Sequence, residues 1–335
     1  MSAVSAEHPR CAVVLCTYNG ERFLPAQLAS LKSQTVQPAV YVLSDDASTD
    51  GTWALLQAFA SERHAAGCEV VLHRNDINMG YVRHFEQALQ QAVDVEVLFP
   101  CDQDDVWHPD KLERMLAVFA ARPELLVLHG NARLIDGEGR DLGRRLFDVL
   151  EVTPDELIAM HSDRAFNVLL RRNIVTGATM GLRSELVEMA RPFSSDWAHD
   201  EWLSVIAAMQ GEVDSIEVPV IDYRLHGGNQ IGVNIRSFAQ RYVGVGMRRR
   251  TYLCQTAHRY TALLNHVQVS LAHSSFKHNI VHEVRERKMH AEIRVNLPRN
   301  LFKRFGVIIV EWKSGRYHRY GSAWRSAVVD FLRLD

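Results

Sequence analysis

The sequence has 335 residues, of which 47% are hydrophobic and 23% are charged. This balance is typical of a globular protein and excludes a disordered, collagen-like or coiled-coil chain. A single domain usually has about 100–200 residues, so the length favours a large domain with an appendage. The five cysteines form no CxxC pair, which indicates reduced thiols of a cytoplasmic protein rather than disulfides or zinc ligands.

The N-terminal residues lack the basic-then-apolar pattern of a signal peptide. No apolar run approaches the ~18 residues that a transmembrane helix requires, so we expect a protein that does not span a membrane. The formal net charge of −2 conceals an asymmetry, because residues 236–335 contain 19 Lys and Arg against 6 Asp and Glu. The residues before them are correspondingly acidic, and an acidic body with a basic tail predicts two separate roles.

The first 120 residues alternate strand and helix patterns. This alternation predicts a mostly parallel α/β sheet with helices on both faces, and ligands bind beyond the carboxyl ends of such strands. Polar clusters follow three of the strands, namely Thr17-Tyr18-Asn19, Asp45-Asp46 and Asp102–Asp105. Short apolar runs predict strands at 12–15, 40–43, 69–72 and 95–99, and helical spacing predicts helices at 22–33, after residue 49 or 50, at 82–91 and at 110–120.

The pattern becomes irregular after residue 125. We expect residues 136–165 to be rich in loops and the chain beyond 235 to form one or two amphipathic helices, until Pro298 interrupts them. A basic, aromatic segment follows at 299–324. Between these regions, apolar runs predict strands at 125–129, 179–182 and 218–223, and helical spacing predicts a helix at 202–209.

Asp102 and Asp104 are separated by one residue directly after a predicted strand. A turn of this kind can aim both carboxylates at one hard cation, and Mg²⁺ or Mn²⁺ prefers oxygen ligands. Such an ion would neutralise charge on a diphosphate leaving group. The alternative is an exposed acidic turn that caps the helix after Pro109.

Three motifs in register resemble glycosyltransferase family 2, and most closely its bacterial rhamnosyltransferase-like branch. They are LCTYNGE at 15–21, SDDASTDGT at 44–52 and DQDDVW at 102–107. The match covers about 10–232, and the closing GRYHRY at 315–320 also resembles that branch. The resemblance implies a GT-A fold, with a Rossmann-like nucleotide-binding half at about 10–120 and an acceptor half at 121–232. We therefore expect a catalytic domain at 1–232 and a helical basic extension at 233–335.

The same resemblance assigns residues to the donor nucleotide-sugar. Tyr18 would stack on the base, and Asp46 would accept a hydrogen bond from an imide N–H, which fits uracil or thymine better than a purine. The alternative for Asp46 is a turn that leads into a capped helix, and Arg83 is as well explained as a solvated helix residue. The full expected donor set is Thr17, Tyr18, Asn19, Glu21, Asp46, Arg83, Asp102 and Arg224.

The sequence HDEW at 199–202 resembles the acidic motif of the family, in which an aspartate is the general base. We assign this role to Asp200, with Glu201 as the substitute and an N-cap as the structural alternative. YRLHGGNQ at 223–230 resembles another family segment. Its His226 would join Asp102 and Asp104 as a metal ligand, or would contact the diphosphate.

The basic tail allows three interpretations. The segment 299–324 could lie on the cytoplasmic face of a membrane, where anionic lipids attract Lys and Arg. It could instead pack within the protein or between subunits of a homo-oligomer. Nucleic-acid binding uses the same electrostatics but finds no supporting motif here.

The combined evidence predicts a metal-dependent, inverting glycosyltransferase of the bacterial cytoplasm, peripheral on the inner face of the membrane. The resemblance implies a dTDP- or UDP-sugar donor, with dTDP-L-rhamnose favoured, and a surface-glycan or lipid-linked acceptor. A nucleotidyltransferase that acts on a sugar phosphate is the alternative within enzymes, although no Gly-rich, Lys-containing triphosphate loop is present. A non-catalytic protein that binds a nucleotide-sugar or a membrane is the alternative outside enzymes.

Overall fold

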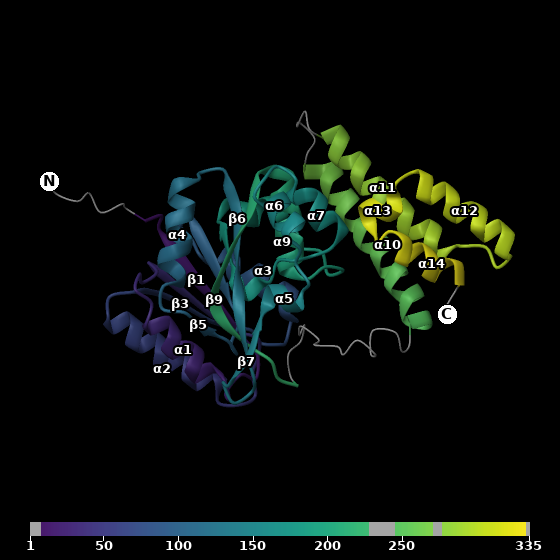
Figure 1. The fold of residues 1–335 in the computed structure, drawn as a ribbon. Helices are drawn as coiled ribbons and strands as arrows, with labels where there is room; N and C mark the ends of the chain where they lie inside the picture. Colours follow the sequence, from purple (N-terminus) through teal and green to yellow (C-terminus); the bar gives the residue numbers. More distant parts are fainter. Residues whose placement is uncertain (1–7, 228–244, 271–276, 333–335) are drawn as a thin grey trace. The chain divides into compact units, whose positions relative to one another are not determined.

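The computed structural model describes residues 8–227, 245–270 and 277–332 (Figure 1). These residues form two compact units. The first contains residues 8–165 and 174–227, and the second contains 166–173 together with the described residues beyond 244. The short segment 166–173 therefore belongs with the C-terminal helices, although it lies within the first unit in sequence.

The first unit is built on one mixed sheet, which has nine strands across the described residues. The order is β3-β2-β1-β4-β8-β6-β9-β5, and β7 pairs with β6. The predicted parallel pairing joins β3, β2, β1 and β4, whereas β8 runs antiparallel to both β4 and β6. The strands are β1 (Cys11–Thr17), β2 (Val40–Asp45), β3 (Glu69–Arg74), β4 (Val97–Cys101), β5 (Val106–Trp107), β6 (Leu125–Ile135), β7 (Asp141–Arg145), β8 (Met180–Arg183) and β9 (Glu212–Arg224).

Helices cover both faces of this sheet, which explains why its central strands are apolar without alternation. One hydrophobic cluster joins Val13 and Leu15 of β1 to α1, α2 and α4. The helices α3, α8 and α9 pack together, and α3 also contacts β1, β2 and β4. The helices of this unit are α1 (Leu24–Lys32), α2 (Thr52–Ala65), α3 (Tyr81–Gln90), α4 (Lys111–Ala121), α5 (Leu146–Val149), α6 (Pro154–Met160), η1 (Gly177–Thr179), α8 (Glu185–Ala190) and α9 (His199–Gln210).

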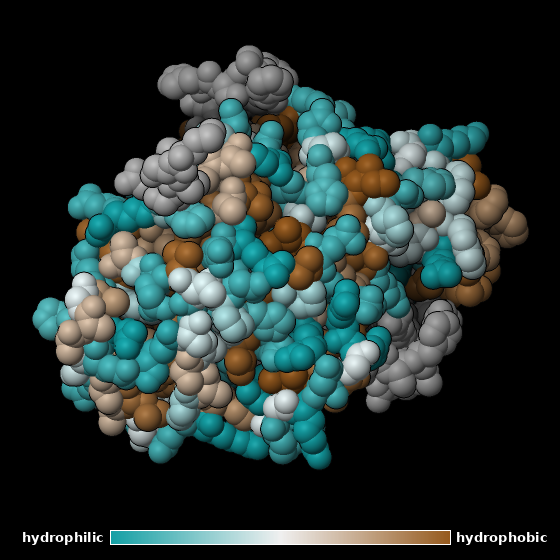
Figure 2. All heavy atoms as spheres, turned by 60° about the vertical axis from the view of Figure 1, so that its left-hand side comes forward, coloured by the Kyte–Doolittle hydropathy of each residue, from teal (hydrophilic) through white to brown (hydrophobic). Residues whose placement is uncertain are grey.

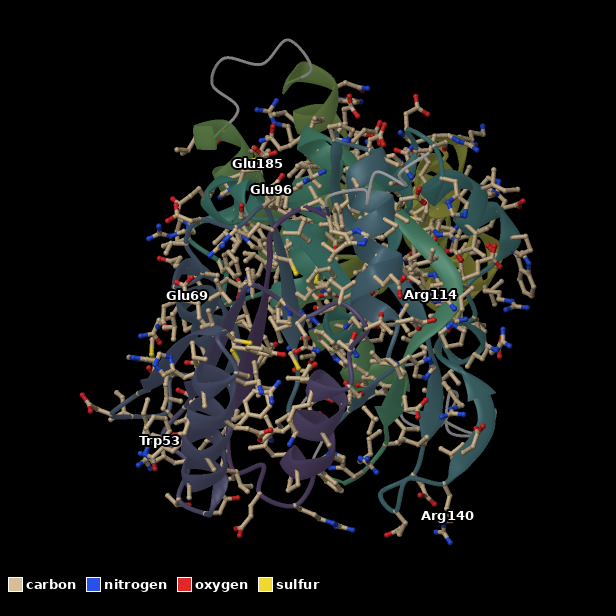
Figure 3. All side chains as sticks on the ribbon, turned by 90° about the vertical axis from the view of Figure 1, so that its left-hand side faces the viewer. Trp53, Glu69, Glu96, Arg114, Arg140 and Glu185 are labelled. Carbon is tan, nitrogen blue, oxygen red and sulfur yellow. The ribbon has the colours of Figure 1, made fainter. Side chains whose placement is uncertain are left out.

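The expectation of a loop-rich stretch at 136–165 is wrong. β7 pairs antiparallel with β6, and Arg140 lies at the connection between these two strands (Figure 3). The helix α6 begins with a capping box, in which the Thr153 hydroxyl accepts from the N–H of Glu156 and the Glu156 carboxylate accepts from the N–H of Thr153. These elements are short and their exposed faces are polar, so the apolar periodicity on which the sequence analysis depends is too weak to reveal them.

The second unit is helical, as the pattern beyond residue 235 predicts. Its helices are α7 (Ala165–Arg171), α10 (Val245–Ser270), α11 (Lys277–Val295), α12 (Leu301–Lys313), α13 (Arg316–Tyr320) and α14 (Trp324–Leu332). The long helices α10 and α11 pack against each other. α7 joins them through the carbonyl oxygen of Leu170, which accepts from the Tyr260 hydroxyl and from Nε of Arg287.

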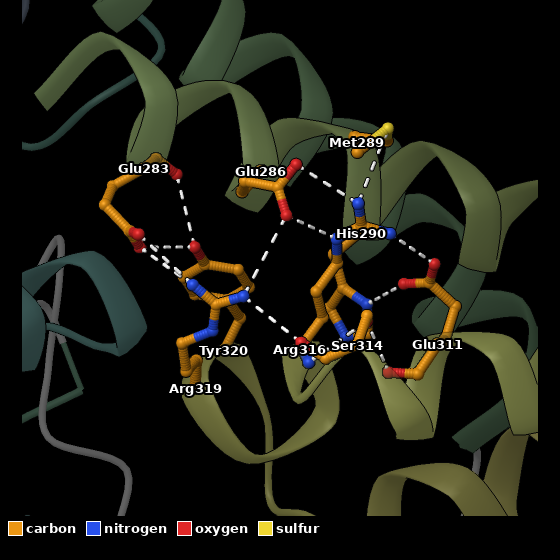
Figure 4. Close-up of polar contacts among 9 residues, drawn as sticks. All are labelled: Glu283, Glu286, Met289, His290, Glu311, Ser314, Arg316, Arg319 and Tyr320. Atoms are coloured by element: carbon orange, nitrogen blue, oxygen red, sulfur yellow. Dashed lines mark hydrogen bonds and ion pairs between the residues drawn. The ribbon is translucent and has the colours of Figure 1, made fainter. Parts of the chain in front are cut away.

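Part of the basic charge of 299–324 is neutralised within this unit. Arg316 lies between two carboxylates, with its Nε 2.8 Å from Oε2 of Glu286 and its Nη1 2.6 Å from Oε1 of Glu311 (Figure 4). Glu311 also accepts from Nδ1 of His290. Arg319 pairs with Glu283, whose carboxylate also accepts a hydrogen bond from the Tyr320 hydroxyl. Arg316 and Arg319 thus hold α13 against α11, and carboxylates of the same unit offset their charge.

The surface drawn in Figure 2 is largely hydrophilic, with apolar residues in small groups. None of the helices in the described parts of the chain is long and apolar enough to cross a membrane.

A glycine in β8 gives a test of this packing. A Cβ added at Gly181 would lie 2.7 Å from a ring carbon of Phe99 and 3.1 Å from one of Phe119. We expect Gly181→Ala to lower the free energy of unfolding by about 1–3 kcal/mol, because the rings must shift in a filled core. The matched control is Gly137→Ala, where the nearest atom would lie at 3.8 Å. Equal urea midpoints for the two variants would contradict the packing described here.

Candidate functional site

The carboxyl ends of three parallel strands meet at one edge of the sheet. Thr17 at the end of β1 is opposite Asp45 at the end of β2, and Leu15 is opposite Cys101 at the end of β4. The polar clusters that follow these strands therefore share this edge, as the sequence predicts. β9 brings a fourth segment to the same place, because the N–H of Arg224 donates to Oδ1 of Asp105 at 2.9 Å.

The side chain of Gln103 joins the acidic loop after β4 to the loop after β1. Its Oε1 accepts from the N–H of Tyr18 at 2.8 Å, and its Nε2 donates to the carbonyl oxygen of Tyr18 at 3.0 Å. A Cβ added at Gly20 would lie 2.2 Å from the same Oε1. The glycine of the TYNG motif thus leaves the space in which this amide lies.

The residues after β1 bond mainly to the loop after β2. The buried hydroxyl of Thr17 donates to Oδ1 of Asp45 at 3.0 Å. Asn19 has a left-handed backbone with a φ of 48°, and its Oδ1 accepts from the N–H of Thr49 at 2.8 Å. The Glu21 carboxylate accepts from the N–H of Gly51 at 2.9 Å. In the ligand-free protein these three side chains shape the edge, whereas the ring of Tyr18 is exposed.

Asp46 organises a second loop. Its carboxylate accepts from Nδ2 of Asn75 at 2.8 Å, from the N–H of Met79 at 2.9 Å and from the N–H of Gly80 at 3.1 Å. These bonds fold the segment before α3 over the end of β2. A base that bonds to Asp46 would therefore use an oxygen that already accepts a hydrogen bond. A carboxylate allows this, because its two oxygens have about four lone-pair sites.

The two arginines expected at the donor already have partners. Nη1 of Arg83 lies 2.7 Å from Oε2 of Glu86, and half of the Arg83 side chain is exposed on α3. The guanidinium of Arg224 is buried and donates to the carbonyl oxygens of Asp104, Asp136 and Gly137. A phosphate contact from Arg224 would require these bonds to be exchanged, and one from Arg83 would require its bond to the buried Glu86 to be exchanged.

Burial, and after it mutual repulsion, sets the electrostatics of the acidic loop. Burial and the neighbouring carboxylates of Asp104 and Asp200 raise the pKa of Asp102 to about 7. Burial and the same loop raise the pKa of Asp105 well above its ordinary range. Lys111 opposes this accumulation of negative charge from beneath the loop, and burial lowers the pKa of its own ammonium to about 7. These carboxyl groups therefore keep their protons to a higher pH than aspartates in water do, and protonation suppresses part of the charge of the loop.

Asp104 is joined to the end of β9. Its Oδ2 lies 2.8 Å from Nε2 of His226, and both side chains are mostly buried. The ring of Phe23 lies 4.5 Å from the His226 ring, centroid to centroid, and its face lies under the Arg224 guanidinium. His226, which the sequence analysis assigns to the same site as the acidic motif, is thus in contact with Asp104 of that motif.

The chemistry of this donor set fits a divalent cation. Asp102 and Asp104 carry carboxylate oxygens and His226 carries an imidazole, which are groups that divalent cations accept as ligands. In the part of the chain that the structure describes, no three His, Cys, Asp or Glu side chains gather as a metal-binding group. The remaining coordination positions would belong to donor oxygens and water.

Asp200 lies inside the first turn of α9. This helix begins at His199 after the N-cap Ala198, so the N-cap alternative for Asp200 is wrong. Its Oδ2 accepts from the N–H of Gly177 at 2.9 Å, which ties α9 to the turn η1, and its charge acts on Asp102. The neighbouring His199 is buried against Phe85 and stays neutral, because burial lowers its pKa to about 3.

A comparison with protein families decides the identity of this fold. The family model described as Glycosyl transferase family 2 matches residues 12–188, which is more than half of the chain. The chain belongs to glycosyl transferase family 2. The match includes both the loop after β1 and the acidic loop after β4, and it ends before α9.

Individual relatives agree with this family. An uncharacterized glycosyltransferase of Nostoc sp. is 25% identical over 66% of this chain, which spans 66% of that protein's length, just under two thirds. The Escherichia coli UDP-Glc:alpha-D-GlcNAc-diphosphoundecaprenol beta-1,3-glucosyltransferase WfgD is 24% identical over 58% of this chain and 69% of its own. The fold is similar to that of S. aureus TarS 1–349, crystallised with UDP-GlcNAc, with a TM-score of 0.55 and 15% identity over 97% of this chain and 89% of that one.

Sequence reasoning missed two residues of this family 2 site. Gln103 stands between the two motif aspartates, and only its position there could have indicated that it contacts another loop. In the sequence, Lys111 is an ordinary residue at the start of a predicted helix. In the structure it is fully buried, and its ammonium donates to the carbonyl oxygen of Ala178 at 2.8 Å. No local pattern distinguishes such a lysine from a solvated one.

The repulsion in the acidic loop has a measurable consequence. The folded state holds a proton on Asp102 up to about pH 7, whereas the ordinary pKa of an unfolded aspartate is about 3.9. Its contribution to stability therefore falls as the pH rises between these values. We expect Asp102→Asn to raise the melting temperature of the metal-free protein at pH 8 by about 2–4 °C and to change little at pH 5. A melting temperature at pH 8 below that of the wild type would contradict this account.

Proposed function

We propose that this family 2 protein transfers a sugar from a nucleotide-diphosphate donor to a hydroxyl of an acceptor glycan. The observation that carries the proposal is the loop Asp102–Asp105, which is bonded to the loop after β1 through Gln103 and to the end of β9 through Asp104 and Asp105. A bound cation would take the place of the protons that burial and repulsion keep on this loop, and the cation would in turn attract a diphosphate. The same edge of the sheet holds Asp200, a candidate base.

The donor in this proposal is a pyrimidine nucleotide-sugar. Tyr18 offers an exposed ring for stacking, and the carboxylate of Asp46 lies at the end of the adjacent strand. Both a dTDP-sugar and a UDP-sugar fit an imide N–H at this carboxylate. The name of the relative WfgD supports UDP, whereas the resemblance to rhamnosyltransferases supports dTDP-L-rhamnose. WfgD also supports a lipid-linked acceptor.

Asp102, Asp104 and His226 would hold the cation, Mn²⁺ or Mg²⁺, against the donor diphosphate. When bound, the ion supplies positive charge that stabilises the departing nucleoside diphosphate. Arg224 would position the acidic loop that holds the cation, because its backbone N–H and its guanidinium bond to that loop from the β9 side. Gln103 fixes the loop from the β1 side.

Asp200 would act as the general base in a single displacement. Its carboxylate removes the proton from the acceptor hydroxyl while that oxygen attacks the anomeric carbon, and the nucleoside diphosphate leaves from the opposite face. The N–H of Gly177 holds one carboxylate oxygen in place. This order inverts the configuration at the anomeric carbon and needs no covalent intermediate.

Binding of nucleotides tests the donor side. We expect UDP or dTDP to bind more tightly than GDP or ADP in calorimetry with Mn²⁺, and to lose this binding in EDTA. Asp104→Asn should weaken the Mn²⁺-dependent binding about 100-fold or more, because a ligand is removed. Asp196→Asn, an exposed change on the loop before α9, is the control. Wild-type affinity of the Asp104 variant, or a preference for purines, would reject the donor assignment.

Turnover tests the base. Asp200→Asn should retain nucleotide binding and lose transfer by about 100- to 10,000-fold, the usual contribution of a general base. The readout is release of nucleoside diphosphate from a nucleotide-sugar in the presence of a lipid-linked acceptor. Transfer at the wild-type rate would assign the base elsewhere, with Glu201 as the next variant. Release of pyrophosphate from a nucleoside triphosphate would favour a nucleotidyltransferase.

A further inference from the structure

A cavity in the second unit is lined by four arginines, four aliphatic residues and one aspartate. It has a volume of about 220 Å³ and lies among α10, α11, α14 and the connection that follows α11. Arg249 and Arg250 come from α10, Arg294 from α11 and Arg299 from the connection, and Asp330 of α14 is the one acid in the lining. These side chains give the cavity a net charge of +3. The volume is sufficient for a phosphate group.

Two of the arginines are fixed by the fold. Arg294 donates through Nε to Oδ2 of Asp330 at 2.7 Å, and Arg249 donates through Nε to Oδ1 at 3.1 Å. The Tyr317 hydroxyl donates to the same carboxylate at 2.7 Å. Asp330 is thus fully engaged and cannot neutralise further charge.

The other two arginines are exposed. Within the described residues, the guanidinium groups of Arg250 and Arg299 make no ion pair or hydrogen bond. They add two positive charges to a lining whose one acid, Asp330, is already paired. Arginine forms paired hydrogen bonds with phosphate oxygens, so the cavity has the charge and the donors to bind a phosphate.

Exposed apolar side chains follow soon after Arg299, a residue of the cavity lining. Leu301, Phe302 and Phe305 on α12 are 55%, 90% and 54% exposed, and they follow Arg299 directly in the chain. The ring of Phe305 lies 5.9 Å from that of Phe331 on α14, next to Asp330. Large aromatic residues that stay exposed beside basic groups are typical of surfaces that enter the headgroup region of a membrane.

We propose that this arginine cavity binds the phosphate of an anionic membrane lipid, while Phe302 and its apolar neighbours on α12 enter the interface beside it. The proposal concerns attachment of the protein to a membrane and does not depend on the transfer reaction. The proposal also limits the expected membrane contact of 299–324 to the start of that segment, because Arg316 and Arg319 are already paired with glutamates of α11. A free phosphate has the same chemistry as the lipid headgroup, so the experiment must separate the two.

The test is co-sedimentation of the full chain with vesicles. We expect binding to vesicles that contain phosphatidylglycerol and none to pure phosphatidylcholine. Arg250→Glu and Arg299→Glu should each lower the partition coefficient about five-fold or more, and Phe302→Ser should lower it as well. Arg285→Glu is the matched control, because the substitution makes the same change in charge. Arg285 is an exposed residue of α11 and lies outside the cavity lining. Thermal unfolding checks that every variant is folded.

Several outcomes would overturn the proposal. Equal losses for Arg285→Glu and for the cavity variants would mean a diffuse electrostatic attraction without a site. Failure of the wild type to bind phosphatidylglycerol vesicles would reject a membrane lipid, and binding of inorganic phosphate in calorimetry by that same protein would identify a soluble anion instead. Release from vesicles by inorganic phosphate, which the cavity variants no longer show, would support the assignment.

Discussion

The repulsion among carboxylates at the end of β4 is the constraint around which the site is arranged. Asp102, Asp104 and Asp105 crowd one loop, and Asp200 adds its charge from α9. An isolated loop of this kind would spread apart. Here Gln103 bonds it to one side, the N–H of Arg224 bonds it to the other, and Lys111 supports it from below. The fold thus keeps several carboxyl groups buried close together, where burial and repulsion raise the pKa values of Asp102 and Asp105.

The parts of this site that the sequence predicts are those set by short-range patterns. Buried strands such as 12–15 and 40–43 are continuous apolar runs, and their ends fix where Thr17, Asp46 and Asp102 must lie. Relations between distant segments are not encoded in this way. Nothing local indicates that Gln103 reaches Tyr18, that Arg224 turns inward to backbone carbonyls, or that Lys111 is buried under a tryptophan ring. The short elements in 136–165 are missed because so few of their residues are apolar.

The second unit shows why charge composition alone predicts function poorly. Its many arginines look alike in the sequence, but the fold gives them different uses. Arg316 and Arg319 bind glutamates of α11, and Arg249 and Arg294 secure Asp330. Arg250 and Arg299 instead lie exposed at the arginine cavity. The aromatic residues divide in the same way, since Tyr317 is buried and Phe302 is almost fully exposed.

The amide of Gln103 also bears on how changes at this edge combine. Since one side chain contacts the loop after β1 and belongs to the loop after β4, order in each loop depends on order in the other. A nucleotide that orders Tyr18 would raise the affinity of the acidic loop for a cation, and the cation would raise the affinity for the nucleotide by the same factor. Substitutions at Gly20 and at Asp104 should therefore be non-additive, although the two residues have no atom in contact.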